Sequence, residues 1–92
     1  MKKERKSKVK RYNGKLNVIG SKVRRLREDK NMSLAQLSDK LQLMGIDIPK
    51  SSIQHLEEGN RIVKEYEFYG LCKILGVTME DMLNDFITEI EQ

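Results

Sequence analysis

The sequence predicts an all-α domain of five helices that follows a basic, flexible N-terminal arm. Apolar residues recur at helical spacing from residue 19 almost to the end of the 92-residue chain. The alternation of apolar and polar residues that marks a β-strand is absent. A chain of this length builds one small domain with a modest core. We therefore expect one bundle of helices over residues 18–92, with the arm in residues 1–17.

The first two helices are marked by apolar spacing and by a capping motif. Ile19, Val23 and Leu26 recur at i, i+4 and i+7, which places them on one side of a first helix. Ser33 begins an S-x-x-Q capping box, so a second helix is expected from this residue. Gly45 marks the end of the second helix.

The third helix, about residues 50–58, is short and follows Pro49, which keeps the preceding residue out of helical angles. Ile53 and Leu56 anchor it to the core, and Gly59 follows its last residue. Two inward residues leave the rest of this helix free to face outward.

The fourth helix is expected over about residues 64–75 and ends at Gly76. Thr78 caps a fifth helix. The fifth helix has a broader apolar side than the end of so small a bundle needs, and this side consists of Met82, Leu83, Phe86, Ile87 and Ile90.

The outward side of the third helix is polar. Lys50, Ser51, Gln54 and His55 lie on it, because Ser51 is three residues from Gln54 and four from His55. Lys, Ser and Gln side chains can hydrogen-bond base edges, and Gln can pair with adenine through two bonds. A short helix after a helix and a turn fits the helix-turn-helix motif, whose second helix enters the major groove. Any small bundle also exposes a polar face, so the pattern alone leaves both interpretations open.

The positive charge is concentrated in the arm. Residues 1–17 hold eight Lys or Arg residues against Glu4, a net charge of +7, whereas the remaining 75 residues carry −3. A basic run of this kind is often a solvated, disordered segment. It can also neutralise nucleic-acid phosphates or enter a minor groove, and the two descriptions agree if the arm orders on binding.

The sequence lacks the residues that several classes of protein need. One cysteine, Cys72, allows no internal disulfide, and one Cys with one His builds no metal cluster. We expect no cofactor and no enzymatic activity, since no Ser-His-Asp set, paired carboxylates or glycine-rich phosphate loop is visible. The sequence has no apolar run of about 18 residues, so we expect no membrane span. The cytoplasm is the expected compartment.

Three segments carry a more specific pattern: IGSKVRRLREDKNMSLAQLSDKL, IPKSSIQHLEEGNR and LCKILGVTMEDML. Their most telling parts are S-x-x-x-L in the second helix, S-S-I-x-x-L-E-x-G in the third and L-G-V-T after the fourth. On these motifs, the stretch from Ile19 to Leu83 resembles the phage-repressor/Cro (Xre) family of helix-turn-helix regulators. The resemblance implies a lambda-repressor-like, five-helix DNA-binding domain whose third helix is the recognition helix.

The resemblance also assigns residues to roles. It implies a buried ion pair between Arg27 and Glu57 that ties the first helix to the recognition helix. The candidate DNA-reading residues are Lys50, Ser51, Ser52, Gln54 and His55. Candidate contacts with the DNA backbone come from the arm and from the residues after the recognition helix: Lys8, Lys10, Arg11, Lys15, Asn60 and Arg61.

Two features depart from the family pattern. Leu34 stands where the family usually has a Gln that contacts phosphate, which puts that contact in doubt. The connection QLMGIDIP between the second and third helices is several residues longer than usual, and we expect Ile46 or Ile48 to pack inward. Pro49 replaces the usual Ser or Thr cap of the third helix, so Asp47 is the candidate substitute.

These observations predict a sequence-specific double-stranded DNA-binding protein, most simply a repressor that binds a roughly palindromic operator as a homodimer. Met82, Phe86 and Ile90 are the candidate dimer interface, with Leu83 and Ile87 closing the core. The alternatives are an antitoxin-like module whose main partner is a protein, such as a toxin or a regulator, and non-specific nucleic-acid binding through the arm alone.

Overall fold

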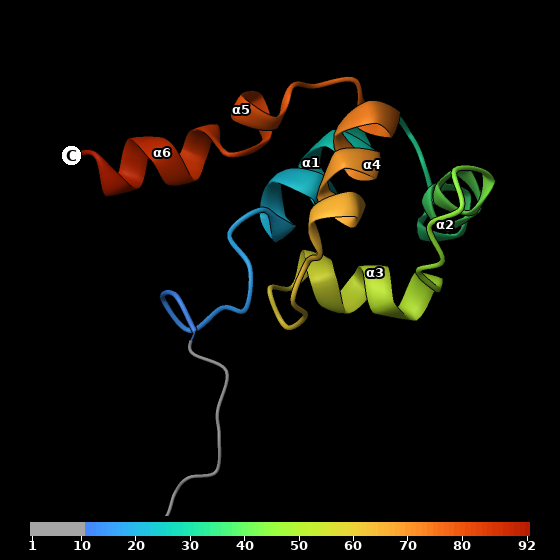
Figure 1. Cartoon of the computed structure of the whole chain (residues 1–92), viewed down its shortest axis with the longest axis horizontal. Helices are drawn as coiled ribbons and strands as arrows, with labels where there is room; N and C mark the ends of the chain where they lie inside the picture. The colour runs from blue at the N-terminus through green and yellow to red at the C-terminus, as the bar shows by residue number, and fades with distance from the viewer. Residues whose placement is uncertain (1–10) are drawn as a thin grey trace, which may run out of the picture.

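The computed structural model describes residues 11–92, and within this range it is all-α, as predicted (Figure 1). The only β-type backbone pairing in this range is an isolated bridge between Tyr12 and Lys15. The described residues form six helices: α1 (Gly20–Asp29), α2 (Leu34–Leu43), α3 (Lys50–Glu57), α4 (Glu65–Leu75), α5 (Met79–Met82) and α6 (Asn84–Ile90).

The core lies where α3 and α4 each pack against both α1 and α2. The buried residues come from the apolar sides that helical spacing indicates, because residues three or four apart share one side of a helix. The side chains that are almost wholly removed from solvent are Val23, Leu37, Leu41, Ile48, Ile53, Leu56, Leu71, Leu75 and Met82.

The predicted helix starts and stops are present. Ser33 Oγ accepts a hydrogen bond from the Gln36 N–H at 3.0 Å, and the Gln36 side chain accepts one from the Ser33 N–H at 2.8 Å. Thr78 caps α5 by accepting from the Asp81 N–H at 3.0 Å. Gly45 and Gly59, which follow α2 and α3, both have a φ of 81°, a left-handed conformation that favours glycine.

The long connection between α2 and α3 packs inward at both of its isoleucines. Ile46 and Ile48 are buried, and the Ser38 hydroxyl donates to the Ile48 carbonyl at 2.6 Å. Asp47 does not cap α3: Pro49 is the N-cap residue, and no side chain bonds to the helix start. The prediction for Asp47 is wrong because side chains alternate along an extended chain, so the residue between two inward isoleucines points outward.

The predicted fifth helix is divided at Leu83 into α5 and α6. Met82 lies in the core with 1% of its surface exposed, so its assignment to a surface interface is wrong. The prediction placed Met82 on one helix with Phe86 and Ile90, whereas in the structure α5 ends at Met82 and the other two residues lie on α6. Phe86 is half-buried against Tyr12, with the ring centroids 5.2 Å apart in an edge-to-face arrangement. Ile90 remains 54% exposed.

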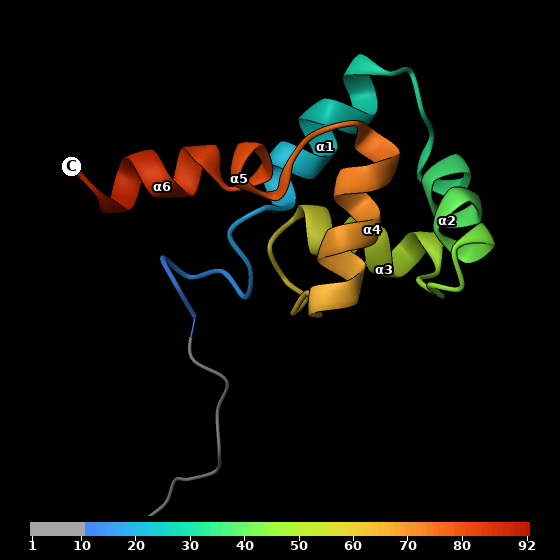
Figure 2. The same cartoon turned by 45° about the horizontal axis from the view of Figure 1, so that its top comes forward.

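Helix α6 extends away from the body at the end of the molecule opposite α2, in both views of the fold (Figures 1 and 2). None of its residues is fully buried. An Arg25–Asp85 ion pair at 3.0 Å joins it to α1.

The folded part of the chain begins earlier than the predicted boundary at residue 18. Residues 12–17, here called the clasp, contact the helical body. Tyr12 and Lys15 exchange backbone hydrogen bonds of 2.8 and 2.9 Å across a tight turn, in which Asn13 and Gly14 have φ angles of 51° and 76°. The predicted boundary followed the charge distribution, which does not indicate these contacts, because most of them are made by backbone, amide and aromatic groups.

Candidate nucleic-acid interface

Helix α3 presents one apolar and one polar side, as the spacing predicted. Ile53 and Leu56 are fully buried. On the other side Lys50, Ser51, Gln54 and His55 are exposed, and Ser52 is half-buried. The structure therefore brings the candidate DNA-reading residues to one open surface.

An ion pair fixes the inner side of α3 to α1. Arg27 Nε donates to one carboxylate oxygen of Glu57 at 2.7 Å, and its terminal nitrogen donates to the other at 3.0 Å. The two side chains are 11% and 3% exposed, so this is the buried pair that the family resemblance implies. The hydrogen bonds to Glu57 raise the pKa of Arg27, against the opposing effect of burial. Arg27 also donates to the Met32 carbonyl at 2.8 Å, which ties the start of the helix-turn-helix to the same pair.

Helix α1 approaches α3 closely through a glycine. A Cβ atom at Gly20 would overlap the Leu56 carbonyl oxygen and would lie 2.8 Å from that of Glu57. Glycine at this position therefore allows the first turn of α1 to rest on the backbone at the end of α3. Any larger residue would push α3 outward.

The surface beside Gln54 belongs to α1 and α2. Gln54 lines a cavity of about 130 Å³ together with Arg24 and Leu34. Gln54 thus faces the α1 side of the interface. Leu34 is half-buried. Its hydrocarbon side chain offers no polar group at the position where the family carries its phosphate-contacting Gln.

The candidate backbone contacts divide into three groups. Lys8 and Lys10 lie outside the described residues. Asn60 is exposed just beyond α3 and is available to a phosphate. Arg11 and Lys15 are exposed, but each already donates to a backbone carbonyl, of Gly14 and of Glu58 respectively, both at 3.1 Å.

Arg61 also has a structural partner within the fold. Its guanidinium forms two hydrogen bonds of 2.8 and 3.0 Å with the carboxylate of Glu67, a buried residue of α4. Burial opposes ionisation of Glu67, but the bonds from Arg61 and from the Lys64 N–H outweigh it and lower the pKa of the carboxyl group. Arg61 is therefore held by a structural ion pair. The spacing of apolar residues did not indicate this pair, because a glutamate within a helix is usually exposed.

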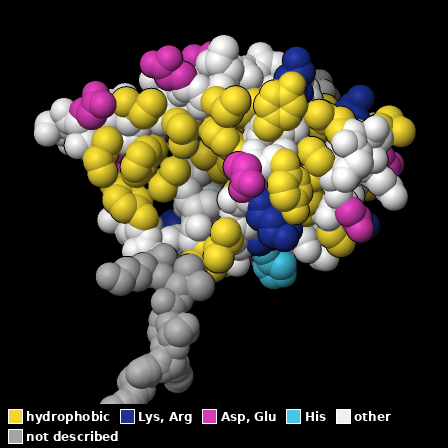
Figure 3. Space-filling model, viewed as in Figure 1, with side chains coloured by type: hydrophobic (Ala, Val, Ile, Leu, Met, Phe, Trp, Pro, Cys, Tyr) yellow, Lys and Arg dark blue, Asp and Glu magenta, His cyan; other side chains and the backbone are white. Residues whose placement is uncertain are grey.

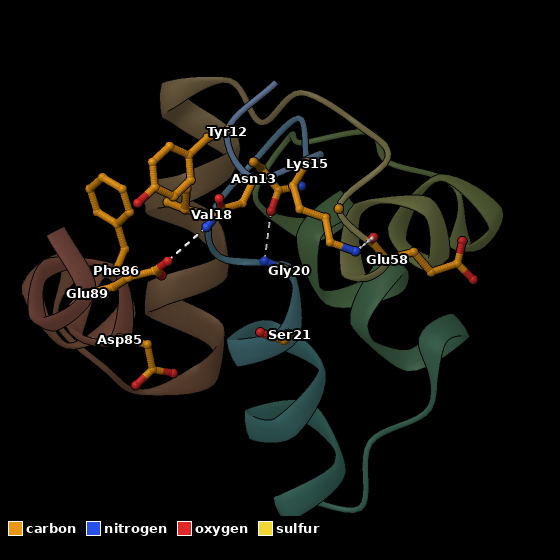
Figure 4. Close-up of a pocket in the computed structure, with 12 residues that line it drawn as sticks. Tyr12, Asn13, Lys15, Val18, Gly20, Ser21, Glu58, Asp85, Phe86 and Glu89 are labelled. Atoms are coloured by element: carbon orange, nitrogen blue, oxygen red, sulfur yellow. Dashed lines mark hydrogen bonds between the residues drawn. The ribbon is translucent and has the colours of Figure 1, made fainter. Parts of the chain in front are cut away.

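The clasp is the part of the interface region that sequence reasoning missed. It lies between the end of α3 and α6 and borders a cavity of about 230 Å³ (Figure 4). Asn17 makes more side-chain hydrogen bonds than any other residue of the clasp. One local signal was present, since Asn is a favoured cap residue and lies three positions before α1 begins.

No helix within residues 11–92 is long and apolar enough to cross a membrane. A comparison with protein-family models matched a helix-turn-helix domain at residues 20–85. Comparisons with curated proteins and with solved structures found no match. The matched range contains α1 through α5 and the first residues of α6, including the open polar side of α3. The chain therefore belongs to the helix-turn-helix domain family, in agreement with its resemblance to Xre-type DNA-binding proteins.

Proposed function

We propose that this chain is a sequence-specific double-stranded DNA-binding protein that represses transcription from a roughly palindromic operator. The helix-turn-helix family supports DNA binding and a regulatory role. The observation that supports sequence specificity is that α3 is fixed in place: two buried apolar residues and a buried ion pair hold its inner side. Its outer side presents exposed Lys, Ser, Gln and His side chains.

A fixed helix with free polar groups is what base reading requires. Hydrogen bonds to base edges depend on donor and acceptor distances of about 2.7–3.2 Å, so the helix that carries the side chains must not rotate or slide. Serine, glutamine and lysine can each meet the edges of bases in the major groove. Lys50 and Ser51 lie in the first turn of α3, the part of a recognition helix that enters the groove first.

The exposed surface of α6 supports a homodimer. Hydrophobic side chains gather over α6 and the neighbouring part of the body (Figure 3). With Met82 assigned to the core, the remaining interface residues are Phe86 and Ile90, of which Ile90 is the more exposed. A second copy packed on this surface across a two-fold axis would match an operator with two-fold symmetry, whose half-sites in helix-turn-helix dimers lie about one helical turn apart.

The same exposed surface also favours the main alternative, an antitoxin-like protein that binds another protein through α6 and DNA secondarily. Such a chain would form a complex of unequal subunits, whereas the proposed repressor binds its own copy. Sedimentation of the purified protein at micromolar concentration separates the two, because only the homodimer doubles the mass without a partner.

Selection of binding sites from random duplex DNA tests the proposal directly. We expect one enriched sequence with two-fold symmetry, bound more tightly than its scrambled version by at least about a thousand-fold at physiological salt. Enrichment of no sequence, together with steeply salt-dependent binding to every duplex, would instead show that the basic arm alone binds nucleic acid.

A further inference from the structure

The Asn17 side chain joins three parts of the fold. Its Oδ1 accepts hydrogen bonds from the N–H groups of Ile19 at 3.0 Å and Gly20 at 2.8 Å, which caps the start of α1. Its Nδ2 donates to the Leu56 carbonyl at 3.0 Å and to the Arg61 carbonyl at 2.8 Å. One amide group thus links α1 to the last turn of α3 and to the loop that follows it.

Two neighbouring residues of the clasp contact the same end of α3. The Lys15 ammonium donates to the Glu58 carbonyl at 3.1 Å (Figure 4). The Leu16 N–H donates to the Gly59 carbonyl at 2.7 Å. The last carbonyls of a helix have no partner within it, and a positive charge is favourable there. The clasp therefore adds hydrogen bonds from a distant part of the sequence to carbonyls at and just after the end of α3, beside the local bonds that close this helix.

The other end of the clasp is held by α6. Tyr12 packs edge-to-face on Phe86, and Asn13 donates to Glu89 at 2.8 Å. The clasp is thus fixed at both ends. Residues 12–17 also lie outside the range 20–85 that matches the helix-turn-helix family. The family match therefore does not account for these contacts.

We propose that Asn17 is a positioning residue for DNA recognition, whose amide holds the C-terminal end of α3 against the start of α1. This inference rests on the proposed function. Helix α3 has eight residues and is therefore only about 12 Å long. A shift of about 1 Å at its end would tilt the whole helix and misalign hydrogen bonds to bases. Contacts with phosphates tolerate such a tilt, because they act mainly through charge.

Two substitutions separate the cap of α1 from the hold on α3. Asn17→Asp has the same shape and keeps a side-chain oxygen for the Ile19 and Gly20 N–H groups, but it removes both donated bonds. Asn17→Ser does the same without adding a charge and serves if the aspartate variant does not fold. Thr78→Ala is the control, since it removes a helix cap on α5, away from α3.

The DNA measurement compares affinity for the selected operator with affinity for its scrambled sequence. We expect the Asn17 variants to lose about ten-fold of this ratio, the effect of one or two hydrogen bonds, with little change on scrambled DNA. Thr78→Ala should keep the ratio. An unchanged ratio in folded Asn17→Ser, or equal losses on both duplexes, would overturn the inference.

Hydrogen exchange tests the positioning without DNA, so failure of the proposed function is distinguishable. The N–H groups of Glu58, Gly59 and Asn60 close the end of α3 by bonding to carbonyls within it. In Asn17→Ser they should exchange about ten-fold faster while the amides of α5 stay unchanged, and Thr78→Ala should show the reverse. Unchanged exchange at the end of α3 would refute the positioning role even if the protein binds DNA. Selection of no operator by the wild type would refute the proposed function, and the exchange result would still decide the role of Asn17.

Discussion

Single residues of α3 have roles that follow from the side of the helix on which they lie. Ile53 and Leu56 are fully buried and set its rotation, while the Ser51 and Gln54 side chains are exposed on its other side. Their substitution should therefore change recognition while leaving the fold intact.

Ser51→Ala or Gln54→Ala should relax base preference at one position of the operator. The expected cost is about 1–3 kcal/mol of discrimination for a side chain that makes a good pair with a base. Binding to the selected operator and to single-base variants of it would measure this. Equal losses on operator and scrambled DNA would mean that these side chains do not read bases.

The Arg27–Glu57 pair is a second feature at this scale. Glu57→Ala leaves a largely buried guanidinium unpaired, and we expect a loss of about 3–5 kcal/mol in the free energy of unfolding. Urea unfolding of Glu57→Ala, Arg27→Ala and the double variant forms a cycle in which the double variant should cost less than the sum. Additive losses would show that the two residues do not stabilise each other.

The Arg61–Glu67 pair provides a matched control for that cycle. It has the same chemistry and a similarly buried carboxylate, but it joins the α3–α4 loop to α4 and leaves the α1–α3 contact intact. Glu67→Ala should also destabilise the protein. Among variants that remain folded, only loss of the Glu57 pair should reduce the preference for operator over scrambled DNA.

At the scale of elements, the N-terminal segment has two parts: residues 1–10, which are rich in positive charge, and the clasp, which contacts the helices. Residues 1–10 carry six Lys or Arg residues and one Glu. The clasp instead acts through its backbone, amide and aromatic contacts with α3, α1 and α6. Deletions that end before and within the clasp should therefore separate the effect of the charged residues 1–10 from the effect of the clasp contacts.

Deletion of residues 1–10 should leave thermal stability unchanged and weaken DNA binding. Each phosphate contact that is lost should reduce the slope of log affinity against log salt by about 0.9. Deletion of residues 1–15 also removes Tyr12 and Lys15 and should lower the melting temperature. An unchanged slope in the shorter deletion would show that these ten residues do not contact phosphates.

At the scale of the whole molecule, α6 and α2 lie at opposite ends (Figure 1). Each end carries an exposed aliphatic side chain: Ile90 on α6, and Leu43, which is 89% exposed, on α2. Only the end at α6 is proposed to bind a second copy. The two positions therefore form a matched pair for testing where the dimer forms.

Ile90→Glu should produce folded monomers that bind the operator much more weakly, because each half-site would then be bound independently. Leu43→Glu makes the same change at the other end and should leave the dimer intact. Ile90 is a better choice than Phe86, whose substitution would also break the contact with Tyr12. Sedimentation measures both variants. A wild type that is monomeric both free and on the operator would rule out the dimer.

Local patterns predicted the parts of this molecule that depend on neighbours in sequence. The helical spacing of apolar residues, the Ser33 capping box and the glycine stops are properties of a few adjacent residues, and all are present. The polar side of α3 follows in the same way. The break at Leu83 has no glycine or proline to mark it, so the burial of Met82 could not be predicted from spacing.

The sequence by itself determined an all-α helix-turn-helix chain and the exposed polar side of α3, because helix periodicity decides which side of each helix is apolar. Only the tertiary structure decided how that surface is held. Asn17 bonds to carbonyls 39 and 44 residues away, and the close approach of α1 to α3 depends on Gly20. Backbone carbonyls are the same in every residue, so their pairing with a distant side chain leaves no trace in sequence and appears only when the helices are packed.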